Sequence, residues 1–174
     1  MYDDTAEFWC DVMLVEGEEP LITYRTGMVV YEESLTKGRF VSRGWNGAVF
    51  VNFYDGRIDP LAIPLPQAFR LEIDGQFLGG EWQWVCFERR DNDQPIPAMP
   101  RPYQIHTIVT LQHAVRPITV QVHTGLDGSA VLTRWLEVTN TGAQPAALAS
   151  AASMSPAATA SPSTTPDVPA RWTA

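Results

Sequence analysis

The sequence predicts an all-β protein, an antiparallel β-sandwich. First, short segments rich in β-branched and aromatic residues recur along the chain, and several alternate apolar with polar positions, as half-buried strands do. Second, turns rich in Gly, Asp, Asn and Pro separate these segments. Third, no segment has the 3.6-residue apolar period of a helix, and the 14 prolines disfavour long helices.

The first predicted strands lie on either side of a proline-containing loop. Gly47–Tyr54 places Val49, Val51 and Phe53 on one face, and an Asp-Gly pair ends it. Phe69–Ile73 alternates apolar and charged residues, as a half-buried strand does. The next Asp-Gly pair, Asp74-Gly75, suits the positive φ angles of a type I′ turn, so it predicts a β-hairpin.

The second half of the body predicts four more strands. The returning limb of the hairpin is expected to continue, through a bulge at Gly79-Gly80, into Glu81–Glu88. Gln104–Gln112 and Ile118–His123 follow after a charged, proline-rich loop, and Ala130–Thr139 completes the series. In the third of these segments Ile, Val and Val face one side, while Thr, Gln and His face the other.

The domain organisation predicted from these patterns is one folded body with two different ends. Residues 1–26 form an acidic, partly ordered N-terminal segment, and residues 27–142 form the sandwich. Residues 143–174, which are rich in Ala, Pro, Ser and Thr, are predicted to be a disordered tail, because this composition buries little apolar surface. The abrupt loss of the strand pattern near residue 150 suggests an incomplete sheet, from a gene that is truncated or read out of frame. A stand-alone sandwich with a natural tail is the alternative.

Charge and composition exclude several classes of partner. The net charge of −8 disfavours nucleic acid and anionic membrane surfaces. No apolar run approaches the ~20 residues of a membrane-spanning helix, and the acidic N-terminus does not resemble a secretory signal, so a cytoplasmic location is expected. Two free, largely buried thiols are expected at Cys10 and Cys86. Unpaired strand edges of an incomplete sheet make a homo-oligomer plausible.

No catalytic motif is present in the sequence. His106, His113 and His123 lack the spacing of a metal site, and they are expected on solvated strand faces or at sheet ends. Aspartates that precede a glycine are explained by their turns. Phosphate-binding loops, dinucleotide fingerprints and nucleophile elbows are missing, so we assign no catalytic residue, metal or cofactor.

The tryptophans suggest a binding surface. Trp82 and Trp84 are two residues apart on a predicted strand, so both project to one face, and Trp45 lies in a turn that could reach the same surface. Indole rings suit the C–H faces of sugars, which makes these three residues a candidate carbohydrate platform. The alternative is that they pack in the core or against a neighbouring domain. Trp135, among the leucines and valines of its strand, is expected in the core.

One stretch carries a resemblance to a known family. The residues concerned are Val131, Leu132, Arg134, Trp135, Glu137, Val138, Asn140, Gly142, Pro145 and Leu148. They resemble the end of the N-terminal β-supersandwich, a galactose-mutarotase-like fold, of alpha-galactosidase-type (melibiase-like) glycoside hydrolases. Phe69–Leu78 with Trp82–Trp84, and Ile118–His123, resemble earlier strands of such domains.

The resemblance implies a non-catalytic, carbohydrate-associated domain. In that family the chemistry belongs to two aspartates of a following (β/α)₈ barrel, which needs ~250 residues and is absent from this chain. The implied partners are that barrel and a galactoside or other carbohydrate, and the chain alone is not expected to be an enzyme. Two alternatives stay open. One is a stand-alone carbohydrate-binding module that uses Trp45, Trp82 and Trp84, and the other is a small aldose-epimerase-like enzyme that uses His and Glu as acid and base.

Overall fold

The computed structural model describes residues 9–47, 65–91, 104–153 and 171–173, and it confirms an all-β sandwich. These ranges contain no helix, so the described residues include no helix that could cross a membrane. The strands are β1 Cys10–Val15, β2 Leu21–Thr26, β3 Val29–Thr36, β4 Arg39–Gly47, β5 Phe69–Ile73, β6 Gln76–Phe77, β7 Trp82–Asp91, β8 Ile105–His113, β9 Ile118–Leu126, β10 Leu132–Asn140, β11 Leu148–Ser153 and β12 Arg171–Thr173.

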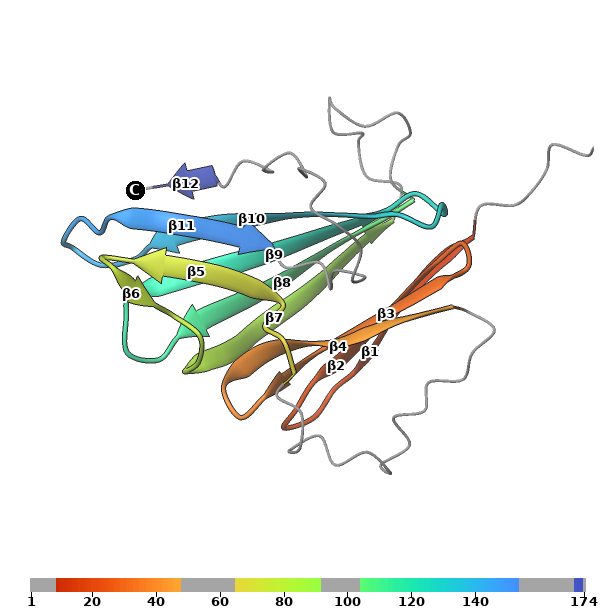
Figure 1. Cartoon of the computed structure of the whole chain (residues 1–174), viewed down its shortest axis with the longest axis horizontal. Helices are drawn as coiled ribbons and strands as arrows, with labels where there is room; N and C mark the ends of the chain where they lie inside the picture. Colours follow the sequence, from red (N-terminus) through yellow and green to blue (C-terminus); the bar gives the residue numbers. More distant parts are fainter. Residues whose placement is uncertain (1–8, 48–64, 92–103, 154–170, 174) are drawn as a thin grey trace, which may run out of the picture.

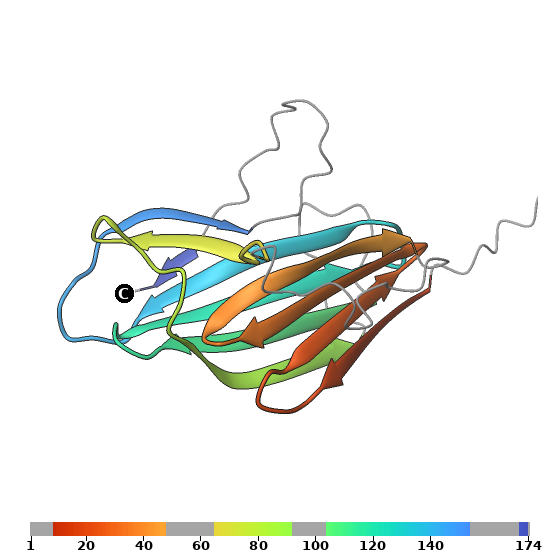
Figure 2. The same cartoon turned by 60° about the horizontal axis from the view of Figure 1, so that its bottom comes forward.

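The strands form two layers (Figures 1 and 2). One layer is a five-stranded sheet in the order β12-β10-β9-β8-β7, antiparallel except for the parallel pair β10-β12. The other layer contains the antiparallel meander β1-β2-β3-β4 and the small sheet β11-β5-β6. Backbone hydrogen bonds from Ser42 to Pro66 and from Ala68 to Phe40 connect these two sheets at their shared edge. We call the face of the five-stranded sheet toward the other layer its inner face, and the opposite side its outer face.

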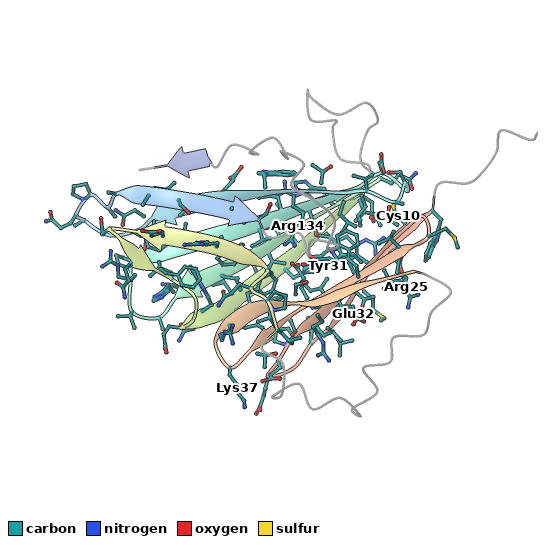
Figure 3. The ribbon with its side chains drawn as sticks, in the orientation of Figure 1. Cys10, Arg25, Tyr31, Glu32, Lys37 and Arg134 are labelled. Atoms are coloured by element: carbon teal, nitrogen blue, oxygen red, sulfur yellow. The ribbon has the colours of Figure 1, made fainter. Side chains whose placement is uncertain are left out.

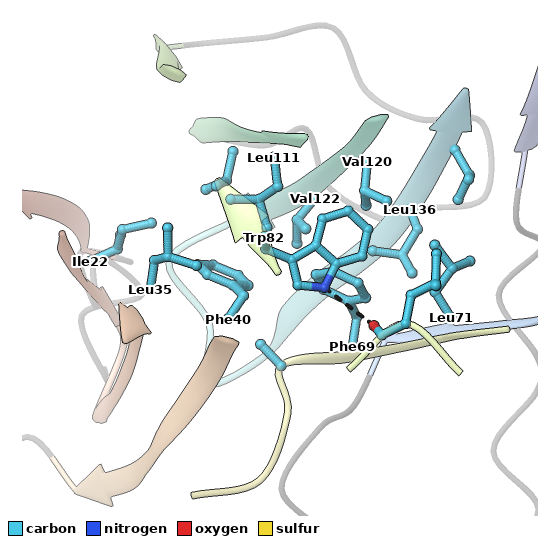
Figure 4. Close-up of a cluster of buried hydrophobic side chains, with 14 of the residues drawn as sticks. Ile22, Leu35, Phe40, Phe69, Leu71, Trp82, Leu111, Val120, Val122 and Leu136 are labelled. Carbon is cyan, nitrogen blue, oxygen red and sulfur yellow. Dashed lines mark hydrogen bonds between the residues drawn. The ribbon is translucent and has the colours of Figure 1, made fainter. Parts of the chain in front are cut away.

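The core lies between the layers, because alternate residues of both layers point inward. Ile22 and Phe40 come from the meander, Leu71 from the small sheet, and Leu111 and Val120 from the five-stranded sheet (Figure 4). All five are buried. Burial of such aliphatic and aromatic side chains is worth roughly 1.5–3 kcal/mol each, so this cluster supplies the main driving force for folding.

The hairpin predicted at Asp74-Gly75 is confirmed. Both residues have positive φ angles, 52° and 72°, and they join β5 to β6. The chain does not continue from this limb as predicted. β6 is two residues long, and after Gly79-Gly80 the chain enters the five-stranded sheet, where β7 pairs with β8. The chain therefore changes sheets at these glycines instead of forming a bulge.

Both ends of the chain contain strands that the sequence pattern did not reveal. Residues 10–26 of the acidic segment form β1 and β2, since Val12, Ile22 and Tyr24 alternate onto the core. The prediction of a tail disordered from residue 143 is wrong for β11 and β12. β11 is rich in Ala and Ser, but its backbone pairs with β5, and Leu148 and Ala151 pack against the core. The strand expected at Gly47–Tyr54 lies, apart from its first residue, outside the described residues.

The two cysteines are free, as expected, and each is partly exposed. The thiol of Cys10 lies 3.3 Å from the side-chain oxygen of Gln104. Burial raises the pKa of the Cys10 thiol, and nearby Arg89 opposes this effect. This thiol is therefore protonated at neutral pH.

Candidate functional site

The three tryptophans of the expected platform have different surroundings. Trp82 is 2% exposed, its ring meets Phe69 and His113 edge-on, and its Nε1–H donates to the Leu78 carbonyl at 3.2 Å (Figure 4). Trp84 and Trp45 are half-buried and pack against the core. Core packing therefore accounts for Trp82, and its ring offers no face to a sugar. Sugar binding at Trp45 and Trp84 stays a prediction.

Trp135 lies on the outer face of the five-stranded sheet, so its expected place in the core is wrong. Along β10, Arg134, Leu136 and Val138 are buried toward the inner face, and the side chain between each two of them points the other way. Trp135 pairs in register with His123 of β9, which shares the outer face. His106 of β8 lies beside them. Three strands thus bring together two histidines and a tryptophan that are distant in sequence.

The side chains of these three residues form an aromatic cluster. His106 Nε2 and His123 Nδ1 are 3.0 Å apart, a hydrogen-bond distance. The ring of Trp135 is nearly parallel to both imidazoles, with centroids 4.7 Å from His123 and 5.0 Å from His106. Both histidines are only 6% exposed. The expectation that they would be solvated is wrong, because both imidazoles are almost fully removed from water.

A carboxylate completes this cluster. Glu137, two residues after Trp135 on the same face, places Oε2 3.8 Å from His123 Nε2. Burial lowers the pKa of His123 to about 4, with smaller contributions in the same direction from His106 and Arg90, while Glu88 opposes them. His123 is therefore neutral near pH 7 and can accept or pass on a proton. No group of three or more His, Cys, Asp or Glu side chains in the described ranges could hold a metal ion.

The depressed pKa of His123 predicts a pH-dependent stability. The unfolded chain binds a proton at this residue below about pH 6.5, whereas the folded chain binds it only below about pH 4. The contribution of His123 to the free energy of unfolding is therefore complete above about pH 6.5 and is lost as the pH falls toward 4. Urea unfolding across this pH range should show that the free energy of unfolding falls more steeply for the natural chain than for His123→Gln. Parallel curves would contradict the assignment.

A second polar cluster lies between the layers, and sequence reasoning missed it. Glu33 of β3 is fully buried, and its Oε1 lies 2.5 Å from Arg134 Nη1 of β10. The Tyr31 hydroxyl donates to Glu33 at 2.8 Å and accepts from Arg134 at 3.0 Å. Figure 3 shows Tyr31 and Arg134 between the two layers. The available signal was Glu33, a charged residue that alternates with Tyr31 and Leu35 and so shares their face of the strand.

Electrostatics tie this interlayer cluster together. Burial alone would lower the pKa of Arg134, but Glu33 and two nearby tyrosines outweigh it, so the pKa is raised and the guanidinium stays charged. Burial and then Glu33 raise the pKa of Tyr31, which keeps its hydroxyl protonated as a donor. Among the described residues, Glu33 Oε2 and the Nε and Nη2 atoms of Arg134 have no hydrogen-bond partner. The cluster is therefore held by one short ion pair bridged by a hydroxyl.

Comparison with known proteins gives one relevant likeness. A scan against models of protein families and a search of curated proteins both found no match. Among solved structures, the chain is similar to the crystal structure of the GH36 alpha-galactosidase AgaB from Geobacillus stearothermophilus, with a TM-score of 0.53 and 15% sequence identity. The match covers 78% of this chain and 24% of that chain. At this identity the likeness shows the fold, a β-sandwich like one found within a glycoside hydrolase, and the chain spans about a quarter of that enzyme's length.

Proposed function

We propose that this chain is a non-catalytic, carbohydrate-associated sandwich domain of an alpha-galactosidase-like glycoside hydrolase, and that it supports a catalytic barrel which it does not contain. The observation that carries the proposal is the fold likeness to about a quarter of a GH36 alpha-galactosidase. Its partners are then that barrel and a galactoside or related carbohydrate. A domain of this kind contributes stability and binding surface to an enzyme whose chemistry lies elsewhere.

The two polar clusters support a non-catalytic role. Glu33 is fully buried and neutralised by Arg134, so its carboxylate cannot reach a glycosidic oxygen. His106 and His123 are almost fully buried, with Trp135 stacked on both. A general acid or base must come within hydrogen-bond distance of the substrate atom that it serves. Glu33 cannot meet that requirement, and the two histidines present little surface to a substrate.

Two assays on the purified chain test the proposal. A chromogenic α-galactoside should not be hydrolysed above the rate of buffer, because no exposed acid–nucleophile pair is expected. A methyl α-galactoside should bind with a dissociation constant of roughly a millimolar, which is typical of a shallow site with few contacts, measured by NMR titration. Hydrolysis would contradict the non-catalytic role, and absence of binding to any saccharide would contradict the carbohydrate association.

A second candidate function rests on the contact between His123 and Glu137. A neutral imidazole near a carboxylate is suited to acid–base chemistry on a sugar, such as the opening of an aldose ring. This enzyme would accelerate the mutarotation of an aldose and would lose that activity in His123→Gln. Glu18→Gln, which changes an exposed carboxylate in the loop between β1 and β2, is the matched control that should retain it. Mutarotation at the buffer rate would remove this candidate.

A further inference from the structure

One end of the sandwich contains a hollow that neither polar cluster reaches. The segment from β6 to Glu81, just before β7, meets the end of β8 and the β8–β9 turn there, and together they line a half-open hollow of about 360 Å³. Gln76, Phe77, Glu81, His113 and Arg116 supply its side-chain chemistry. We call this feature the turn hollow. Its volume lies at the lower end of the ~300–1,000 Å³ range of small-molecule sites, which suits a ligand of one or two sugar rings.

His113 is a fixed hydrogen-bond donor in the wall of the turn hollow. Its Nδ1 accepts the backbone N–H groups of Val115 at 3.2 Å and Arg116 at 3.0 Å. The ring also meets Trp82 edge-on, with centroids 5.0 Å apart. Burial lowers the pKa of His113, which agrees with a neutral ring whose proton is on Nε2. Trp82, which the sequence suggested as a binding residue, thus supports this wall from the core side.

The backbone of Glu81, which lines the turn hollow, is strained. Its φ angle is +61°, a region that residues other than glycine rarely occupy, although two glycines directly precede it. Its carbonyl accepts the N–H of Ala114 at 2.8 Å, and the next N–H, from Trp82, donates to Gly38 at 2.8 Å. Such strain costs about 1–3 kcal/mol and is commonly found where a side chain must be placed for function. The strained residue here is the one that lines the hollow with a carboxylate.

The remaining chemistry favours a neutral, hydroxyl-rich ligand. Phe77 is 49% exposed; the guanidinium of Arg70 lies over one face of its ring, 5.6 Å from the centroid, and the rest of the exposed ring is available for the C–H face of a sugar. Arg116 is already paired with Asp74, and Glu81 adds a negative charge, so the hollow does not attract a phosphate or carboxylate. Sugar hydroxyls can donate to Glu81 and accept from His113 and Arg116.

We propose that the turn hollow is a binding site for a pyranose sugar, with Phe77 as its apolar contact and Glu81, His113 and Arg116 as its hydrogen-bonding groups. This inference rests on the proposed carbohydrate association and names the surface responsible for it. It also moves the binding site away from Trp45 and Trp84. The site uses side chains from β6, the β6–β7 connection, the end of β8 and the β8–β9 turn, which the hairpin at Asp74-Gly75 and the change of sheet at Gly79-Gly80 bring together.

The test is an NMR titration of the isotopically labelled full chain with methyl α-galactopyranoside and methyl α-glucopyranoside. The backbone amides of residues 76–81 and 113–116 and the indole N–H of Trp82 should shift. Phe77→Ser and Glu81→Gln should each weaken binding roughly tenfold, because each removes one principal contact. Met28→Ser and Glu18→Gln, which change an exposed apolar and an exposed acidic residue elsewhere, should leave binding unchanged.

Each other outcome overturns the site in a recognisable way. Shifts centred on Trp45 or Trp84 would overturn the turn hollow but leave the carbohydrate association intact. No shift with either glycoside would overturn the turn hollow as a pyranose site, whereas the carbohydrate association fails only if no saccharide binds anywhere on the chain. Equal binding by the natural chain and both hollow variants, with well-dispersed spectra showing that all are folded, would overturn the assigned contacts. Inorganic phosphate shifting the same amides more strongly than the glycosides would replace the sugar with an anion.

Discussion

Arg134→Met should lower the free energy of unfolding by about 3–5 kcal/mol, the largest effect expected of a single charge removal in this protein. The substitution leaves the carboxylate of Glu33 fully buried without its partner, and it also removes the hydrogen bond to the Tyr31 hydroxyl. An uncompensated buried charge is far more costly than an absent pair. Urea unfolding at neutral pH, followed by tryptophan fluorescence, measures the loss.

A double-mutant cycle separates the ion pair from simple packing. Glu33→Leu combined with Arg134→Met should recover most of the stability, since apolar residues of similar volume often replace a buried pair at little cost. Arg89→Met is the matched control, because Arg89 pairs with Asp11 and Asp91 where all three side chains are at least a third exposed. That change should cost less than about 1 kcal/mol. Equal losses for Arg134→Met and Arg89→Met would contradict the interlayer assignment.

Trp82→Ala should lower the free energy of unfolding by about 3–5 kcal/mol, because it removes the largest of the described buried side chains and leaves a cavity between the layers. The change removes ring contacts with Phe69 and His113, and it leaves the Leu78 carbonyl without its donor. Chemical unfolding followed by far-UV circular dichroism measures the effect without relying on the lost fluorophore.

Trp84→Ala is the natural comparison, because Trp84 is half-buried on the same strand. This substitution should lower the free energy of unfolding clearly less than Trp82→Ala does. The two interpretations of Trp82 then give opposite results. A core residue predicts a large loss of stability, whereas a sugar platform predicts unchanged stability and lost binding. A Trp82→Ala protein as stable as the natural chain would show that the buried position of the ring is wrong.

The candidate sites were only partly predictable from sequence. Trp82 and Trp84 were correctly expected to share a strand face, but the sequence could not tell which face the other layer covers. Trp135 was misplaced for the same reason, since one strand with apolar residues on both faces has no unique inward side. The turn hollow combines β6, the β6–β7 connection, the end of β8 and the β8–β9 turn, and no local motif indicates that they meet.

The sequence by itself determined the features that depend on neighbours along the chain. Alternation in Phe69–Ile73 and Ile118–His123 identified strands and their two faces, and Asp74-Gly75 identified a turn, because strand period and positive φ are properties of a few consecutive residues.

Tertiary structure alone decided which strands pair and which layer covers each face. It placed Glu33 against Arg134, it made an Ala- and Ser-rich segment into β11 along the edge of β5, and it stacked Trp135 on His106 and His123. Each of these arrangements depends on backbone pairing and burial contributed by residues far apart in the chain, so local pattern and propensity could not specify it.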